Sequence, residues 1–279
     1  MGRDKEKWAG IPAGQDNALD YAVSQRDRRV IDMVDRAARH GEVRLAYQAI
    51  VPAGHHDRPA FYEGLIRVLD ATGRVIPAAE FINEIEETET GRLIDCLALE
   101  KGIETLVQFP GLRLSINMSA RSIGYPRWSE ILQKGFKMDP TLAERLILEI
   151  TERSAMLVPE LVTSFMQDLQ KQGVSFALDD FGAGFTSFRY LKNFYFDVLK
   201  IEGQFIRGIA ENPDNQVLAA ALIAIGRQFD MITVAENVET AADVAYLELL
   251  GVDCLQGYHF GAPTIQPPWA QSKTRKAKG

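Results

Sequence analysis

Short apolar runs recur along most of the chain and alternate with longer stretches whose apolar residues follow a helical period. Such runs predict buried β-strands, and the longer stretches predict amphipathic helices. The eight expected strands cover residues 43–51, 60–68, 112–118, 145–150, 174–179, 197–201, 231–235 and 253–257. The expected helices cover residues 92–109, 127–136, 158–172, 186–193, 214–229 and 240–250. Eight strands with intervening helices predict an α/β fold, a TIM-like (βα)8 barrel.

One connection departs from this alternation. Only the segment VPAGHHDRP separates the first expected strand from Ala60, where the second begins. A crossover between parallel strands needs about a dozen residues or more. The first two strands are therefore expected to form a hairpin, which leaves one strand of the barrel antiparallel to the others.

The two ends of the chain lack a strand pattern. Residues 1–40 are expected to form an N-terminal helical extension, because the apolar residues between Asp16 and His40 have helical spacing. The barrel domain is expected over residues 41–265. Residues 266–279 are interrupted by proline and then basic, which predicts a disordered tail.

Polar residues stand inside or just after most of the apolar runs. They are Glu63, Asn117, Glu149, Asp179, Asp180, Lys200, Glu236 and Gln256. The strand ends of a parallel β/α barrel line its active site, so these side chains are expected to converge. Carboxylate and amide oxygens are ligands of hard divalent cations, and a nearby lysine can stabilise developing negative charge. The pattern therefore predicts a divalent-metal centre for phosphoryl transfer.

The paired aspartates of LDDFGAGFTS are the most distinctive of these residues. Asp179 and Asp180 can flank two cations, and Gly182 and Gly184 let the following loop turn sharply. A structural role as an Asx turn or a helix N-cap needs only one aspartate. A kinase DFG motif does not fit, because the chain has no Gly-rich loop ahead of it and no HRD segment.

Glu149 and Lys200 each interrupt an apolar run. An unpaired buried carboxylate is costly, so Glu149 needs a cation or a lysine beside it. A purely structural ion pair between the two residues is the alternative. Lys200 can orient or activate a water, or it can extend its amine to solvent. Glu239 is either a site residue or a first-turn helix residue that the helix dipole stabilises.

Composition narrows the function classes. The formal net charge of −7 over 279 residues disfavours a nucleic-acid polymer as partner. The 4 histidines have no ligand spacing, which disfavours a histidine-based metal hydrolase. Cys96 and Cys254 lie far apart; reduced thiols are favoured, with a disulfide left open. The longest apolar run is too short to span a bilayer and the N-terminus lacks a signal peptide, so a soluble, cytoplasmic protein is expected.

The polar residues stand in segments that resemble the EAL-domain cyclic di-GMP phosphodiesterases, from about Val43 to Pro263. The matching segments are YQAI, YEGLIR, INMS, LEITE, LDDFGAGFTSFRYL, LKIEGQFI, VAENVET and QGYHFGAP. The resemblance implies a TIM-like barrel with one antiparallel strand. It also implies hydrolysis of cyclic di-GMP to linear pGpG by a metal-activated water, with two Mg²⁺ or Mn²⁺ ions. We expect Ca²⁺ to inhibit, because it prefers looser geometry and acidifies water less.

The resemblance assigns a role to each matching residue. The first cation would be held by Glu63, Asn117, Glu149 and Asp179, and the second by Asp179, Asp180 and Glu236. The catalytic set is Lys200, Glu236 and Glu152, of which Lys200 contacts the nucleophilic water and Glu152 tethers the loop that carries Asp180. Contacts to cyclic di-GMP are implied for Gln48, Leu65 and Arg67, and Gln256 matches a glutamine near the metal site. We also expect Gln256 and Glu239 among the substrate-binding residues. We also expect a homodimer that forms through the loop and helix after Asp180.

Several positions depart from the family pattern without removing an expected cation ligand. Gly64 replaces an alanine, Asn237 replaces a glycine and Glu202 replaces an aspartate; Ala49 and Asn83 replace prolines. These changes bear on rate and affinity more than on the reaction class. Two alternatives stay open. One is a catalytically silent cyclic di-GMP receptor with the same pocket, and the other is a different barrel enzyme, such as an enolase-type lyase with Mg²⁺ and a lysine base.

Overall fold

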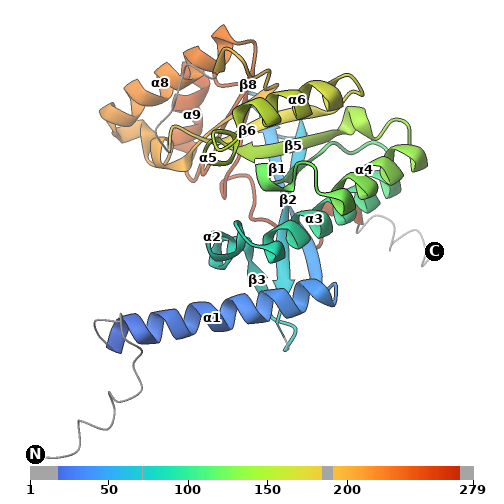
Figure 1. The fold of residues 1–279 in the computed structure, drawn as a ribbon. Coiled ribbons are helices and arrows are strands. Elements are labelled where there is room, and N and C mark those ends of the chain that lie inside the picture. The colour runs from blue at the N-terminus through green and yellow to red at the C-terminus, as the bar shows by residue number, and fades with distance from the viewer. Residues whose placement is uncertain (1–17, 71, 184–190, 271–279) are drawn as a thin grey trace, which may run out of the picture.

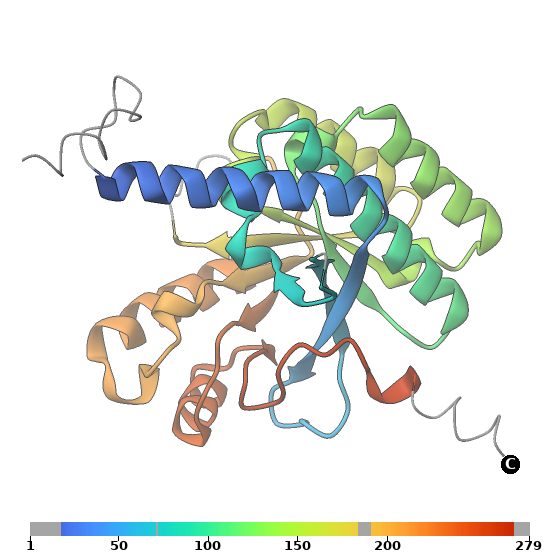
Figure 2. The same ribbon diagram turned by 90° about the horizontal axis from the view of Figure 1, so that it is seen from below.

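The computed structural model describes residues 18–70, 72–183 and 191–270, in which strands form a closed barrel with helices around it (Figures 1 and 2). Around the barrel the strands follow the order β1 (Val43–Pro52), β9 (Cys254–Leu255), β8 (Ile232–Ala235), β7 (Val198–Ile201), β6 (Ser175–Phe181), β5 (Leu146–Thr151), β4 (Leu114–Asn117) and β2 (Phe61–Leu69). Pairing of β2 with β1 closes the ring. The predicted eight-stranded α/β barrel is confirmed.

β1 is the antiparallel strand of the barrel. It pairs antiparallel with both of its neighbours, β2 and β9, whereas the pairs from β2 through β4 to β9 are parallel. The predicted hairpin is therefore confirmed. Its far end carries the short strand β3 (Val75–Pro77), which the sequence pattern does not reveal. α1 (Ala18–Arg39) lies across this projecting end of the hairpin (Figure 1).

Five expected helices are present within a few residues of their predicted bounds. They are α3 (Glu89–Gln108), α4 (Pro126–Met138), α6 (Pro159–Gln170), α8 (Pro213–Gln228) and α9 (Ala241–Leu250). The sequence pattern does not predict the short helices α2 (Ile82–Ile85) and α5 (Glu152–Ala155). Short 3-10 turns cover Ala78–Glu80, Ala120–Ser122, Ala143–Arg145, Gly203–Phe205 and Ile209–Glu211. Local signals explain several boundaries: the side chains of Thr88, Asn212 and Thr240 accept hydrogen bonds at helix starts. Most of the helix expected at 186–193 lies outside the described residues.

The barrel interior has two layers, one apolar and one polar. Every second side chain of a strand points inward. The apolar floor consists of Ile50, Phe61, Ile147, Ala177, Val198, Val234 and Cys254. On each of these strands, the next inward position lies two residues closer to the mouth and is polar. These polar residues are Gln48, Glu63, Glu149, Asp179, Lys200, Glu236 and Gln256, the last two directly after the ends of β8 and β9. The period of two that places the apolar residues in the floor therefore also directs the polar residues into the barrel interior.

The C-terminal segment packs against the barrel as far as residue 270. The Trp269 ring lies 4.2 Å from the Tyr62 ring, 5.3 Å from the Tyr47 ring and 6.5 Å from the Phe109 ring, centroid to centroid. Residues 266–270 are thus ordered, although the sequence predicts a disordered tail from 266. Residues 271–279 lie outside the described part of the chain, and the division into three segments stays a prediction. Among the described helices, none is long and apolar enough to cross a bilayer.

Candidate metal centre

The amine of Lys200 lies at the centre of the polar layer, surrounded by carboxylates. Its Nζ is 2.8 Å from Glu236 Oε1, 2.9 Å from Glu149 Oε2, 3.1 Å from Asp179 Oδ1 and 3.5 Å from Glu63 Oε2. The Lys200 side chain is only 1% exposed. The structure therefore brings together residues from five different segments that the sequence predicts to converge. The ion pair between Glu149 and Lys200 exists, but it is one contact of a larger cluster.

Loss of hydration on burial is the largest effect that disfavours the ionised forms of the side chains in this cluster. Against the attraction of Lys200, it raises the pKa of Glu149 well above its usual value and the pKa of Glu236 to about 8. Burial also opposes ionisation of Glu63, but the Lys200 charge and two side-chain amide donors outweigh it and lower the pKa of Glu63. The amine loses hydration too, yet the carboxylates raise the pKa of Lys200. The cluster holds more carboxylates than its lysine can keep ionised, which is the imbalance that a divalent cation corrects.

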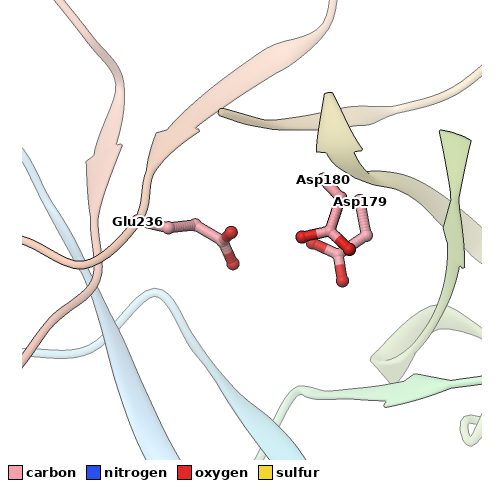
Figure 3. Close-up of side chains that lie close together, drawn as sticks. All are labelled: Asp179, Asp180 and Glu236. Atoms are coloured by element: carbon pink, nitrogen blue, oxygen red, sulfur yellow. The ribbon is translucent and has the colours of Figure 1, made fainter. Parts of the chain in front are cut away.

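Oxygen atoms suitable for cations converge at the mouth of the barrel. One carboxylate oxygen each from Asp179, Asp180 and Glu236 lie within 4.8 Å of one another. In Figure 3 the side chains of the two aspartates of β6 point toward that of Glu236, which follows β8. Deeper in the cluster, Glu149 Oε1 is buried without a hydrogen-bond partner among the described residues. Hard oxygen donors in this arrangement fit a divalent cation. Asp179, Asp180 and Glu236 are also the residues that the resemblance implies for the second cation.

A β-bulge lets both aspartates face the same centre. Adjacent residues in a regular strand point to opposite faces. The pairing of β6 with β7 shifts register between Leu178 and Phe181, and Asp180 takes a left-handed φ of 55°. Burial and the neighbouring Asp179 charge raise the pKa of Asp180 to about 6. The bulge therefore creates the pair that the LDDFG segment suggests.

Glu152 lies at the start of α5 and reaches the chain after Asp180. Its Oε2 accepts a hydrogen bond of 3.1 Å from the backbone N–H of Gly182, and the residue is 4% exposed. This contact is the kind of tether that the resemblance implies. The rest of the loop that Glu152 is expected to tether, residues 184–190, lies outside the described residues. The dimer face expected after Asp180 includes the same segment and stays a prediction.

Gln256 orients Glu63 directly, and Gln48 does so through Gln256. Gln256 Nε2 donates to Glu63 Oε2 at 2.6 Å and to Gln48 Oε1 at 3.1 Å. Gln48 Nε2 in turn donates to the Gly261 carbonyl at 3.1 Å. Asn117 Nδ2 donates to the other oxygen of Glu63 at 2.9 Å. Gln48 and Gln256, both expected among the substrate-binding residues, are thus buried side chains that position Glu63 in this structure.

The remaining expected substrate residues differ in their placement. Leu65 and Arg67 occupy the next inward positions of β2 above Glu63, and both are half-buried. Glu239 is not brought to the cluster: its Oε1 lies 3.1 Å from Arg207 Nε in an exposed salt bridge. Because this charge is already paired, the interpretation of Glu239 as a substrate contact stays a prediction.

The family departures are accommodated by their surroundings. Asn237 takes the left-handed φ of 54° that a glycine would adopt freely, and asparagine tolerates it better than most residues. Glu202 leaves Lys200 within reach of all the carboxylates described above. At Gly64 a methyl group would lie 2.7 Å from Ile116 Cδ1, so the isoleucine side chain fills the space of the missing alanine.

A cavity of about 330 Å³ adjoins the carboxylates, and one residue that lines it is not predicted as a site residue from the sequence. Asp95 on α3 lines this cavity together with Asn117, Glu152 and Asp180. Burial raises the pKa of Asp95 to about 7, even though the carboxylate accepts hydrogen bonds from Ser119 N and Ser122 Oγ. An aspartate within a predicted helix suggests only a solvent-facing charge. Its burial next to the mouth depends on the packing of α3 against the end of β4.

Comparison with known proteins gives matches over most of the chain. A family model described as the EAL domain matches residues 31–263. The chain is 30% identical over 234 residues to the cyclic di-GMP phosphodiesterase PdeB of Shewanella oneidensis, which covers 82% of this chain and 27% of that protein. It is 31% identical over 211 residues to the cyclic di-GMP phosphodiesterase PdeF of Escherichia coli, which covers 73% of this chain and 28% of that protein. The chain thus spans less than a third of either relative.

Solved structures are similar in fold. The PaMucR phosphodiesterase in its c-di-GMP complex superposes with a TM-score of 0.73 and 27% identity, over 85% of this chain and 97% of that chain. The FimX EAL domain of Pseudomonas aeruginosa bound to c-di-GMP gives a TM-score of 0.76 and 25% identity, over 85% of this chain and 96% of that chain. Both neighbours hold the dinucleotide that the sequence resemblance implies.

Proposed function

The chain belongs to the EAL-domain family, and from this premise we propose that it hydrolyses cyclic di-GMP to linear pGpG. The observation that supports the proposal most is the convergence of Asp179, Asp180 and Glu236 at the barrel mouth, beside the buried cluster around Lys200. Water adds to one phosphorus atom and the bond to the 3′ oxygen breaks. Water loses a proton and the 3′ oxygen gains one, so the product carries a 5′ phosphate and a free 3′ hydroxyl.

The residues of the polar layer would hold two divalent cations. Glu63, Asn117, Glu149 and Asp179 would bind one, and Asp179, Asp180 and Glu236 the other. Bound Mg²⁺ or Mn²⁺ would polarise the scissile phosphate and lower the pKa of the attacking water. The buried carboxylates with raised pKa values suit this role, because a cation replaces the protons that they otherwise retain.

Lys200 would act at the reacting phosphate. Its amine is fixed by four carboxylates of the described residues and is held in its charged form. A fixed positive charge that is already desolvated can stabilise negative charge that develops during attack, without reorganisation at that moment. The same amine is a donor that can orient the attacking water. Glu152 would assist indirectly, since its hydrogen bond to Gly182 holds the backbone that follows Asp180.

Incubation of the protein with cyclic di-GMP and Mg²⁺ or Mn²⁺, followed by chromatography, tests the proposal. Linear pGpG is the expected product, and its formation should stop when a chelator removes the cations. Binding of intact cyclic di-GMP without turnover would instead favour the receptor function. Absence of both binding and turnover would reject cyclic di-GMP as the ligand of this pocket.

A further inference from the structure

Two arginines stand directly opposite each other near the mouth of the barrel. In the antiparallel pairing of β1 with β2, Arg44 is the register partner of Arg67. Side chains of directly opposite residues leave the sheet on the same face, with their Cβ atoms about 5 Å apart. Like charges in this position destabilise a sheet, so the pair has no evident structural purpose.

The face that carries the two arginines is the one that continues into the metal centre. Period-two alternation places Arg44 on the face of Gln48, and Arg67 on the face of Glu63. The opposite face of the hairpin carries Leu45, which is buried in the apolar core under the helices. Arg44 is exposed and Arg67 is half-buried, as expected for side chains at the rim of an open site.

Neither guanidinium is neutralised by a carboxylate of the described residues. The salt bridges found there include neither arginine, and Arg67 Nη1 donates to the carbonyl of its own neighbour Ile66 at 3.0 Å. Burial lowers the pKa of the Arg67 guanidinium, against the attraction of Glu63 and of the Tyr258 hydroxyl. In a protein with a formal net charge of −7, two adjacent cationic groups that form no salt bridge with the described residues are a local site for an anion.

We propose that Arg44 and Arg67 jointly bind the second phosphate of the cyclic dinucleotide, the one that the carboxylate-bound cations do not hold. The inference rests on the proposed function and extends it by one residue, Arg44, for which neither the motif segments nor the comparisons give a role. Arg44 lies four positions from Gln48 along β1, and Arg67 lies four positions from Glu63 along β2. At the usual rise of a strand, each backbone separation is about 13 Å. Arginine side chains that lean toward the centre shorten that gap, so a ligand with two phosphates can span it whereas a single phosphate cannot.

Arg44 is a ligand-binding residue in this proposal, because it contacts the phosphate that does not react. Its removal should weaken binding of both ground state and transition state alike, which raises KM and leaves kcat nearly unchanged. A structural role would show differently, as a loss of folding stability. Since Arg44 repels Arg67, the ligand-free Arg44→Gln protein should melt at the same temperature as the parent or slightly higher.

The test compares Arg44→Gln with Arg58→Gln, a control at an exposed arginine near the opposite end of β2. KM and kcat for cyclic di-GMP are measured with Mg²⁺, and Kd is measured with Ca²⁺ while chromatography verifies that the ligand stays intact. Arg44→Gln should raise Kd and KM roughly tenfold, the usual effect of one charge-assisted contact. Its Kd should also depend less on ionic strength than that of the parent. Arg58→Gln should match the parent in all of these measurements.

The outcomes separate the two proposals. If the parent binds cyclic di-GMP and Arg44→Gln binds it within about twofold of the parent, the role of Arg44 is refuted while the proposed function stands. A lower kcat with unchanged KM, or a clear drop in the melting temperature, would refute it as well. If the parent neither binds nor cleaves cyclic di-GMP, the proposed function fails and the inference about Arg44 falls with it.

Discussion

The side-chain amide of Gln256, which follows β9, donates a 2.6 Å hydrogen bond to Glu63 on β2, and both strands flank β1. The residue is 4% exposed, and its amide also reaches Gln48, so the orientation of Glu63 depends on a buried chain of amides. This chain fixes one oxygen of Glu63 from the side opposite to Asn117. The carboxylate of Glu63 is therefore held in a fixed orientation within the polar layer.

Replacement of Gln256 by Leu should weaken cation binding. The change removes a donor that lowers the pKa of Glu63, so the carboxylate becomes harder to ionise and less well oriented. Loss of an outer hydrogen-bond partner typically reduces metal affinity about 10–100-fold. Titration with Mn²⁺, followed by calorimetry and by activation of turnover, measures the effect. Gln204→Leu, a glutamine outside the polar layer, serves as the control. An unchanged Mn²⁺ affinity in Gln256→Leu would contradict the positioning role.

Turnover should require Mg²⁺ or Mn²⁺ and be inhibited by Ca²⁺. Ca²⁺ binds the same oxygen ligands, but its looser coordination and weaker polarisation do not support attack by water. Activity is measured after chelation and after re-addition of each cation, alone and in competition. The melting temperature in each cation provides an independent record of binding, since every cation that binds the folded cluster should raise it. Full turnover in chelator would rule out the cation-dependent mechanism.

Replacement of Lys200 by Ala should reduce kcat by roughly 10²–10³ while cyclic di-GMP still binds. The amine lies within 3.5 Å of four carboxylates among the described residues, so the change also leaves these carboxylates without their counter-charge. The cation-free variant should therefore be less stable than the parent, and saturating Mn²⁺ should restore much of the difference. Kd and kcat are measured with Mn²⁺ present. Parent-like turnover in K200A would mean that the amine is only a structural counter-ion.

Replacement of Gly64 by Ala should destabilise the protein unless Ile116 is shortened at the same time. The new methyl group would lie 2.7 Å from Ile116 Cδ1, which must move in a packed core. Overpacking of this kind costs about 1–3 kcal/mol, and Ile116→Val removes the atom in conflict. Denaturant unfolding of the two single variants and the double variant gives the coupling energy. Additive effects of the two changes would show that Ile116 is not what excludes alanine at position 64.

The stability of the cation-saturated protein should fall as the pH rises from about 4 toward 7. Burial raises the pKa of Asp95 to about 7 in the folded state from 3.8, so in this window the folded protein binds a proton that the unfolded chain does not. Each pH unit then lowers the free energy of unfolding by at most about 1.4 kcal/mol through this residue. Denaturant unfolding from pH 5 to pH 8 measures the slope, with Mg²⁺ present so that the carboxylate cluster does not contribute.

Asp95→Asn is the matched variant for this prediction. Asparagine retains a side-chain oxygen that can accept the hydrogen bonds of Ser119 and Ser122, but it cannot titrate. Its stability should depend less on pH over the same window and should exceed that of the parent near pH 8. Identical slopes for the two proteins would mean that Asp95 titrates near its ordinary pKa.

The barrel and its polar layer follow from local features of the sequence. Apolar runs and helical periods recur at the spacing of β/α units, and the segment between Val51 and Ala60 is too short for a parallel crossover. Side chains alternate along a strand with a period of two. Glu63, Glu149 and Lys200 therefore had to point inward once the apolar residues two positions away, such as Phe61, Ile147 and Val198, formed the floor.

Other features arise only when distant segments pack together. The bulge that turns Asp180 toward Asp179 depends on a register shift between β6 and β7, and neither strand reveals it alone. The burial of Asp95, the outward salt bridge of Glu239 and the contact of Trp269 with the barrel each involve residues far apart in the chain. The burial and the contacts of a side chain depend on the other elements that pack around it. The periodicity of the sequence predicts only the helix or strand in which the side chain lies. Periodicity thus predicts the inward residues of the regular strands, whereas the turn of Asp180 and the distances between the inward side chains follow only from how the strands pack together.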